Sequence, residues 1–174
     1  MIKKILFIIL TVCIFICSCN RTNHAIKHTI GKSISYTITD TINAEYLILR
    51  YVNNPSCTSC QLQAGGWKAF NKRIKKRYQN DVKIIFVVET EKPEEAERLI
   101  RMYKPCDSYT VDSVSNFITS NKLNQDLGKD FVVLLDSTRT VIAIGDPLNN
   151  PKAEDLFFRL MDNKITYIDS LNHP

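Results

Sequence analysis

The 174-residue chain lacks several features that would assign a function at once. It has only three histidines, and His24 and His28 lie in a polar N-terminal stretch, so the ligands for a metal centre are scarce. Its formal net charge of +5 is mild, which argues against a nucleic-acid-binding protein. It contains no internal repeat and no low-complexity tract. We therefore predict no metal site, no nucleic-acid partner and no repeat architecture.

The sequence also lacks an apolar run long enough for a comfortable membrane span. Its longest candidate, residues 5–16, follows Lys3 and Lys4 and ends before Ser18 and Cys19. A short basic segment, an apolar segment and a small residue before cysteine resemble a bacterial lipoprotein signal. A plain secretory signal or an uncleaved anchor is the alternative. The resemblance predicts Cys19 as the lipidated residue.

This interpretation divides the chain into three parts. Residues 1–18 are predicted to be the signal peptide, residues 19–32 a lipid-anchored tether, and residues 33–174 a single domain. The protein would lie in the cell envelope, anchored to the inner or outer membrane and facing the periplasm. In that oxidising compartment, paired cysteines can form disulfides.

Apolar patterning predicts alternating strands and helices in the domain. Strands are expected at residues 33–40, 46–52, 82–88, 109–111, 131–135 and 140–144. Helices are expected at residues 61–78, from Pro93, around 114–118 and from Pro151. Pro93 and Pro151 suit the first helical position, and Asn150 suits the N-cap.

One motif carries chemistry. Cys57 and Cys60 form a C-x-x-C between the predicted strand 46–52 and the predicted helix 61–78. The unpaired N–H groups and the dipole of a helix N-terminus favour a thiolate on the first cysteine. The thiolate is the form that attacks disulfides. The second cysteine, one turn later, can then release a mixed disulfide, so the motif predicts a redox pair.

The sequence resembles the thioredoxin-like lipoproteins of Gram-negative bacteria, which belong to the redoxin and thiol–disulfide oxidoreductase group. The resemblance is carried by residues 57–60 with Leu62 and Trp67, by residues 111–113, 117 and 121–123, and by residues 131–136, 144–147 and 150. It implies an α/β fold with a mixed central β-sheet flanked by helices on both faces. It also implies thiol–disulfide exchange without a cofactor. The implied partners are thiols or disulfides of exported proteins, or a membrane electron donor.

The sequence differs from thioredoxins at positions near the C-x-x-C motif. Thioredoxins carry a cis-proline before the strand equivalent to residues 131–135, and alignment places Asp130 there, after Lys129. Thr58, Ser59, Lys129 and Asp130 are therefore the predicted substrate groove, and the Asp130 carboxylate is expected to raise the pKa of Cys57. Tyr51 stands where a thioredoxin has a buried carboxylate, so no proton-handling acid is evident.

Other interpretations of the cysteines remain open. Cys57 and Cys60 could form a permanent disulfide in a non-catalytic binding module, which the missing proline favours. A thiol peroxidase using Cys57 or Cys106 is a further alternative. Cys106 is expected to be a small buried hydrophobic residue, and the spacing of Trp67 on its helix predicts a core position.

Overall fold

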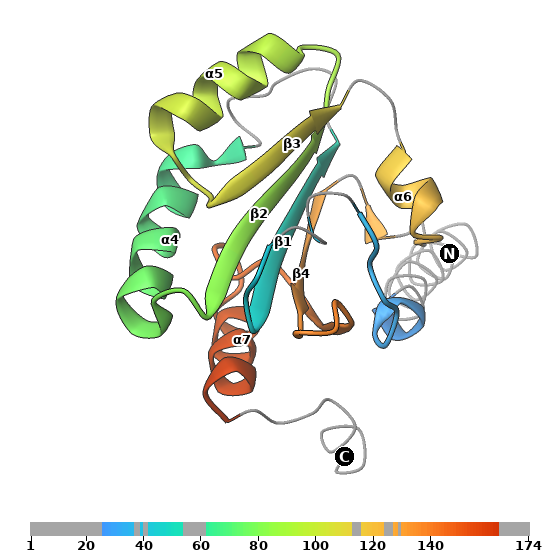
Figure 1. Cartoon of the computed structure of the whole chain (residues 1–174), viewed down its shortest axis with the longest axis vertical. Helices are drawn as coiled ribbons and strands as arrows, with labels where there is room; N and C mark the ends of the chain where they lie inside the picture. Colours follow the sequence, from blue (N-terminus) through green and yellow to red (C-terminus); the bar gives the residue numbers. More distant parts are fainter. Residues whose placement is uncertain are drawn as a thin grey trace, which may run out of the picture.

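The computed structural model describes residues 26–36, 39, 42–53, 62–112, 116–123, 127–128 and 130–163. Within these ranges, five strands form one sheet in the order β3-β2-β1-β4-β5 (Figure 1). The strands are β1 (Tyr46–Asn53), β2 (Val82–Glu89), β3 (Ser108–Asp112), β4 (Asp130–Leu135) and β5 (Val141–Ile144). β1 lies at the centre, between β2 and β4.

The sheet is mixed. β1 pairs with β2 in parallel, and β2 pairs with β3 in parallel. On the other side, β1 pairs with β4 antiparallel, and β4 pairs with β5 antiparallel. The central strands are continuous apolar runs because both of their faces are covered. The predicted strands at residues 46–52, 82–88, 109–111, 131–135 and 140–144 are all confirmed to within two residues.

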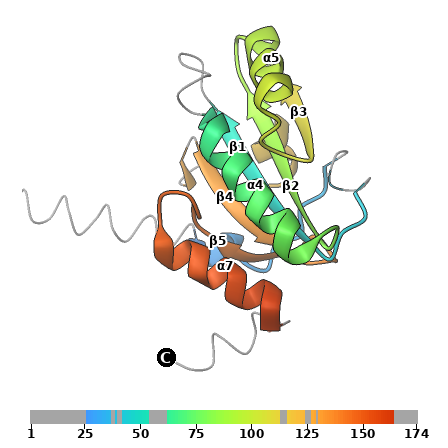
Figure 2. The same ribbon diagram turned by 90° about the vertical axis from the view of Figure 1, so that its left-hand side faces the viewer.

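Helices cover both faces of the sheet. The helices α4 (Ala64–Tyr78), α5 (Pro93–Tyr103) and α7 (Pro151–Asn163) share one hydrophobic core with one face. Figure 2 shows α4 and α7 lying across this face. The short helix α6 (Asn116–Ser120) and residues 30–36 pack against the opposite face. The predicted α/β architecture is thereby confirmed.

Local sequence signals explain where two of the helices begin. Pro93 and Pro151 are the first residues of α5 and α7. Before α7, the Asn150 side-chain oxygen accepts hydrogen bonds from the backbone N–H groups of Lys152, at 3.0 Å, and Ala153, at 3.4 Å. These are the orphan donors that an N-cap residue satisfies. The prediction of Asn150 as an N-cap is confirmed.

The predicted start of α4, residue 61, lies outside the described residues. Leu62 is helical, Gln63 has a left-handed backbone with φ of 42°, and α4 continues from Ala64. Gly65 and Gly66 are part of the helix and do not interrupt it. A Cβ atom on Gly66 would lie 3.1 Å from Cδ1 of Leu148. Gly66 therefore permits close packing of α4 against the loop that precedes α7.

The strand predicted at residues 33–40 is wrong over the residues that the structure describes there. Ser33 forms a single bridge with Thr140, and Thr39 is helical. The backbone N–H groups of Ser35 and Tyr36 donate to side-chain oxygens, those of Asn121 and Thr39. Side-chain partners thus replace the strand partners that the alternating pattern suggested.

Part of the segment predicted as a tether packs against the sheet. The N–H of Gly31 donates to the carbonyl of Val141 at 2.8 Å, and the N–H of Val141 donates to the carbonyl of Lys32 at 2.9 Å. Thr29 is fully buried. Residues 29–32 are therefore attached to β5 rather than extended away from it. None of the described helices has the length and apolar composition of a membrane span.

Candidate active site at the carboxyl end of the central strand

The predicted redox pair lies in the chain between β1, which ends at Asn53, and α4, which begins at Ala64. The predicted site residues Cys57, Thr58, Ser59, Cys60 and Lys129 and the predicted lipidation site Cys19 fall outside the described residues. Their roles therefore stay predictions. The described residues that flank the motif in the sequence are the end of β1 and the start of α4.

Asp130 is the one predicted groove residue that the structure describes. It begins β4 directly opposite Val52 of β1. Its side chain is exposed, and its Oδ1 atom accepts a hydrogen bond from the backbone N–H of Asn53 at 3.3 Å. None of the described peptide bonds is cis. Asp130 thus contacts the strand that leads to Cys57, whereas its distance from the sulfur stays a prediction.

A buried arginine lies on the α4 face of β1. Arg50 is only 3% exposed. Its guanidinium carbon lies 5.1 Å from the ring centroid of Trp67 and 5.8 Å from that of Phe86. A cation over an aromatic face is attracted by the ring quadrupole. Trp67 is fully buried, which confirms its predicted core position, and it also forms part of the surroundings of Arg50.

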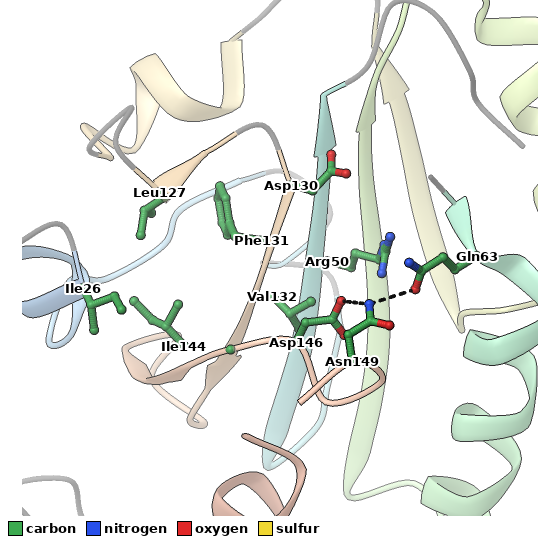
Figure 3. Close-up of a pocket in the computed structure, with 11 residues that line it drawn as sticks. Ile26, Arg50, Gln63, Leu127, Asp130, Phe131, Val132, Ile144, Asp146 and Asn149 are labelled. Carbon is green, nitrogen blue, oxygen red and sulfur yellow. Dashed lines mark hydrogen bonds between the residues drawn. The ribbon is translucent and has the colours of Figure 1, made fainter. Parts of the chain in front are cut away.

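Arg50 lines a pocket of about 330 Å³, which we call the Arg50 pocket (Figure 3). Leu127, Phe131 and Ile144 contribute apolar side chains, and Gln63, Asp130, Asp146 and Asn149 contribute polar ones. In Figure 3, Asp146 and Asn149 lie on one side of the guanidinium and Gln63 on another. The pocket therefore joins β1, the N-terminus of β4, the loop after β5 and the residue before α4.

Hydrogen bonds fix the polar wall of this pocket. The side-chain amide of Asn149 donates to Asp146 at 2.7 Å and to the Gln63 side-chain oxygen at 3.3 Å. The other oxygen of Asp146 accepts from the backbone N–H of Leu148 at 2.8 Å. This wall connects the loop before α7 to the residue that precedes α4.

The Arg50 pocket has an acidic balance. Burial lowers the pKa of Arg50, and the nearby carboxylates of Asp146 and Asp130 oppose that shift. One guanidinium and two carboxylates line the pocket. With all three ionised, the carboxylates outnumber the guanidinium, so the pocket suits a cationic group better than an anionic one.

The opposite face of the sheet holds a buried carboxylate that sequence analysis missed. Glu89, at the end of β2, is 3% exposed. It accepts hydrogen bonds from the Tyr51 hydroxyl, from the Asn53 side-chain amide at 3.2 Å and from the Phe117 backbone N–H at 3.2 Å. These donors satisfy a carboxylate that would otherwise be costly to bury. We call these residues the Glu89 network.

Tyr51 is held within this network by its neighbours. Its ring stacks on Phe117 and Phe131, with centroid distances of 5.4 Å and 4.9 Å. Burial raises the pKa of Tyr51 above its ordinary value, and the hydrogen bond to Glu89 raises it further. Tyr51 stands where the resemblance implies a buried carboxylate, and the Glu89 carboxylate reaches the same region from β2.

The sequence contains a signal for each missed residue. Arg50 interrupts a run that predicts a strand buried on both faces, so a charge inside it was a candidate for a special environment. Glu89 continues the alternation of Ile85 and Val87 on one face of β2. Its proximity to Tyr51 depends on the register between β1 and β2, which the sequence does not reveal.

Cys106 has the surroundings of a packed residue. It lies against the core on the α4 face. Burial, together with the adjacent Asp107 carboxylate, raises the pKa of Cys106 to about 12. Cys106 was predicted to be a small buried hydrophobic residue. It packs against this core, as predicted, but it is only partly buried. Its thiol is a poor nucleophile near neutral pH because the thiolate is disfavoured.

Comparison with known proteins relies on structure, since no family model and no curated protein matches the sequence. A domain of a possible thiol-disulfide isomerase from Cytophaga hutchinsonii is 16% identical, with a TM-score of 0.53 over 78% of this chain and 97% of that one. A proposed protein disulfide isomerase from Bacteroides thetaiotaomicron is 12% identical, with a TM-score of 0.55 over 76% and 88%.

A third solved structure is similar to this chain. A proposed thiol-disulfide oxidoreductase from Bacteroides vulgatus is 15% identical, with a TM-score of 0.51 over 71% of this chain and 78% of that one. Identities this low establish architecture rather than activity. With its mixed five-stranded sheet and a helix following the central strand, this chain has the thioredoxin-like fold.

Proposed function

We propose that the protein carries out thiol–disulfide exchange on exported proteins through Cys57 and Cys60. The observation that carries this proposal is the position of the C-x-x-C motif between β1 and α4 of a thioredoxin-like fold. A strand-to-helix junction is where a helix N-terminus can favour a thiolate. The names of the similar solved structures, which refer to thiol–disulfide chemistry, agree with it.

The exchange proceeds in two displacements. The Cys57 thiolate attacks one sulfur of a substrate disulfide, and the other substrate sulfur leaves as a thiolate. The Cys60 thiolate then attacks the Cys57 sulfur, which releases the second substrate sulfur as a thiolate. The substrate gains two electrons and, after protonation, two thiols, while Cys57 and Cys60 become a disulfide. An external dithiol or a membrane electron donor must reduce this pair again.

Trapping tests the assignment of the two cysteines. Cys60→Ser should accumulate mixed disulfides through Cys57, because the resolving thiol is missing, whereas Cys57→Ser should not. Non-reducing electrophoresis after incubation of each reduced variant with oxidised insulin, which supplies the disulfide, measures the adducts. Adducts in Cys57→Ser alone would reverse the two roles, and their absence in both variants would refute exchange.

We also propose that the protein is attached to a membrane of the cell envelope by a lipid on Cys19, facing the periplasm. The N-terminal residues support this because an apolar segment ends at Ser18 and Cys19. Cys19→Ala should leave the precursor unprocessed and without lipid. Radiolabelled fatty-acid incorporation and cell fractionation measure both effects. Equal labelling and processing of the parent and the variant would contradict the lipoprotein proposal.

A binding module without turnover is the second candidate. The observation that favours it is Asp130, which aligns with the cis-proline of thioredoxins. In place of that proline, a carboxylate accepts a hydrogen bond from the backbone N–H of Asn53. In that case Cys57 and Cys60 form a permanent disulfide. The reduction potential of the pair separates the candidates. A potential too low for cellular dithiols to reduce supports the binding module.

A further inference from the structure

Two hollows share Gln63, the residue that precedes α4, as a lining residue. The first is the Arg50 pocket. The second, which we call the Gly65 groove, has a volume of about 370 Å³ and lies between the start of α4 and the side chains of Leu99 and Tyr103 on α5. Gln63 lines both hollows, and it follows Cys60 by three residues in the sequence.

The Gly65 groove is open because Gly65 has no side chain. A Cβ atom built on Gly65 would meet nothing within 4 Å, whereas one on Gly66 would meet Leu148. Among the described residues, packing of the chain against itself thus accounts for Gly66 but not for Gly65. Its helical backbone shows no positive φ that would call for glycine. The missing side chain leaves space that a ligand can fill.

The wall of this groove is apolar and partly exposed. Leu99 is 9% exposed, and Tyr103 is 40% exposed. Tyr103 and its neighbour Met102, both on the last turn of α5, are the exposed large hydrophobic residues of the described part of the chain. An apolar side chain entering the groove would cover this surface and remove it from water.

We propose that the two hollows together bind one extended segment of the protein substrate across Gln63, with an apolar side chain in the Gly65 groove and a basic side chain in the Arg50 pocket. The two hollows adjoin because Gln63 lines both of them. The carboxylates of Asp130 and Asp146 attract the basic side chain, and together they outnumber the single Arg50 guanidinium, which repels it. The proposal names a substrate class and rests on the proposed exchange at Cys57.

Redox-inactive peptides test the binding separately from the exchange. Four labelled peptides carry serine in place of a central cysteine, with Lys or Glu on one flank and Leu or Ser on the other. Fluorescence anisotropy with the oxidised protein measures their affinities. We expect the Lys and Leu peptide to bind about tenfold or more tighter than the Glu and Ser peptide.

Gly65→Leu should fill the groove with the protein's own side chain. Leucine favours helices more than glycine does, so the fold should be at least as stable. We expect the preference for Leu over Ser to fall by about tenfold while the preference for Lys over Glu persists. Ala69→Leu adds the same side chain at an exposed position of α4 and should leave both preferences unchanged.

Two further variants keep the test decisive. Tyr103→Ala removes one wall of the groove at a partly exposed position, and it should also reduce the preference for Leu. Asp130→Asn should reduce the preference for Lys by about threefold without affecting that for Leu. A selective loss in each variant supports the proposal.

The proposal is overturned if the four peptides bind equally, or if Gly65→Leu and Tyr103→Ala keep the full preference for Leu. If the proposed exchange at Cys57 is wrong, a different experiment shows it. In that case disulfide-linked dimers of the cysteine peptides, from which attack by the Cys57 thiolate would release one peptide as a thiolate, form no mixed disulfide with Cys60→Ser, whatever their flanking residues. Mixed disulfides that form equally with all four cysteine peptides uphold exchange and refute the two-hollow site.

Discussion

Arg50 and Glu89 are buried to the same extent, 3% exposed each, near the same end of the sheet but on opposite faces. Glu89 accepts hydrogen bonds from Tyr51, Asn53 and Phe117, all within the protein. Arg50 stacks on aromatic rings and lines a pocket of about 330 Å³. The comparison teaches that one buried charge holds elements of the fold together through hydrogen bonds, whereas the other lies over aromatic rings at the wall of a pocket.

The largest effect is expected for Glu89→Leu. The substitution leaves the Tyr51 hydroxyl, the Asn53 amide and the Phe117 N–H without their acceptor in the interior. We expect the free energy of unfolding to fall by about 3–5 kcal/mol, because unsatisfied buried donors are costly. Urea denaturation monitored by circular dichroism measures it. Glu89→Gln, which keeps one acceptor oxygen, should lose less, and equal losses would contradict the network.

Arg50→Met is the matched substitution on the other face and should have a much smaller effect on stability. Methionine is apolar, similar in length and able to pack on aromatic rings. Because desolvation of a charge offsets its attractions, we expect a change within about 1 kcal/mol. The fluorescence of Trp67, the only tryptophan, should change because the cation above it is lost. If Arg50→Met lowered the free energy of unfolding as much as Glu89→Leu does, Arg50 would hold the fold together to the same extent as Glu89.

Tyr51→Phe sharpens the comparison by removing one donor of the Glu89 network. We expect a loss of about 1–2 kcal/mol. Since the pKa of Tyr51 is raised in the folded protein, its phenol stays neutral above the ordinary value near 10. Its stabilising contribution is therefore present below about pH 10 and is lost as the pH rises above it. An absorbance titration of phenolate should lack one late-titrating tyrosine in the variant.

The smallest effect concerns Cys106, outside both regions. Because burial raises its pKa to about 12, its thiolate should be scarce at pH 8–9. Iodoacetamide should then modify native Cys106 far more slowly than the unfolded chain, whose cysteines titrate near about 8.5. Mass spectrometry of tryptic peptides measures the two rates. Equal rates at pH 8.5 would show that the thiol is not protected by its surroundings.

Most of the fold followed from patterns that depend on local sequence. β1, β2 and β4 are apolar runs bounded by polar residues, and α5 and α7 begin at prolines. These signals do not depend on knowledge of the neighbouring elements. The strand predicted at residues 33–40 was wrong because its alternation also fits a segment whose backbone bonds to the side chains of Asn121 and Thr39.

The candidate site was less predictable because its residues meet through register and packing. Glu89 reaches Tyr51 only because residue 53 of β1 pairs with residue 89 of β2. Arg50 was part of an apolar run, and the ring positions of Trp67 and Phe86 explain how its charge is accommodated. The Gly65 groove exists because the start of α4 lies beside Leu99 and Tyr103 of α5. None of these relations is encoded in spacing along the chain.

The central place of β1 has a consequence for how the chain is synthesised. β2 and β3 are complete by residue 112, but β4, the other neighbour of β1, begins only at Asp130. Until then a nascent chain has β1 as an edge strand, which can pair with other chains and aggregate. Phe117, a donor to Glu89, also emerges late. Pairing of β4 with β1 is therefore the folding step that removes this edge.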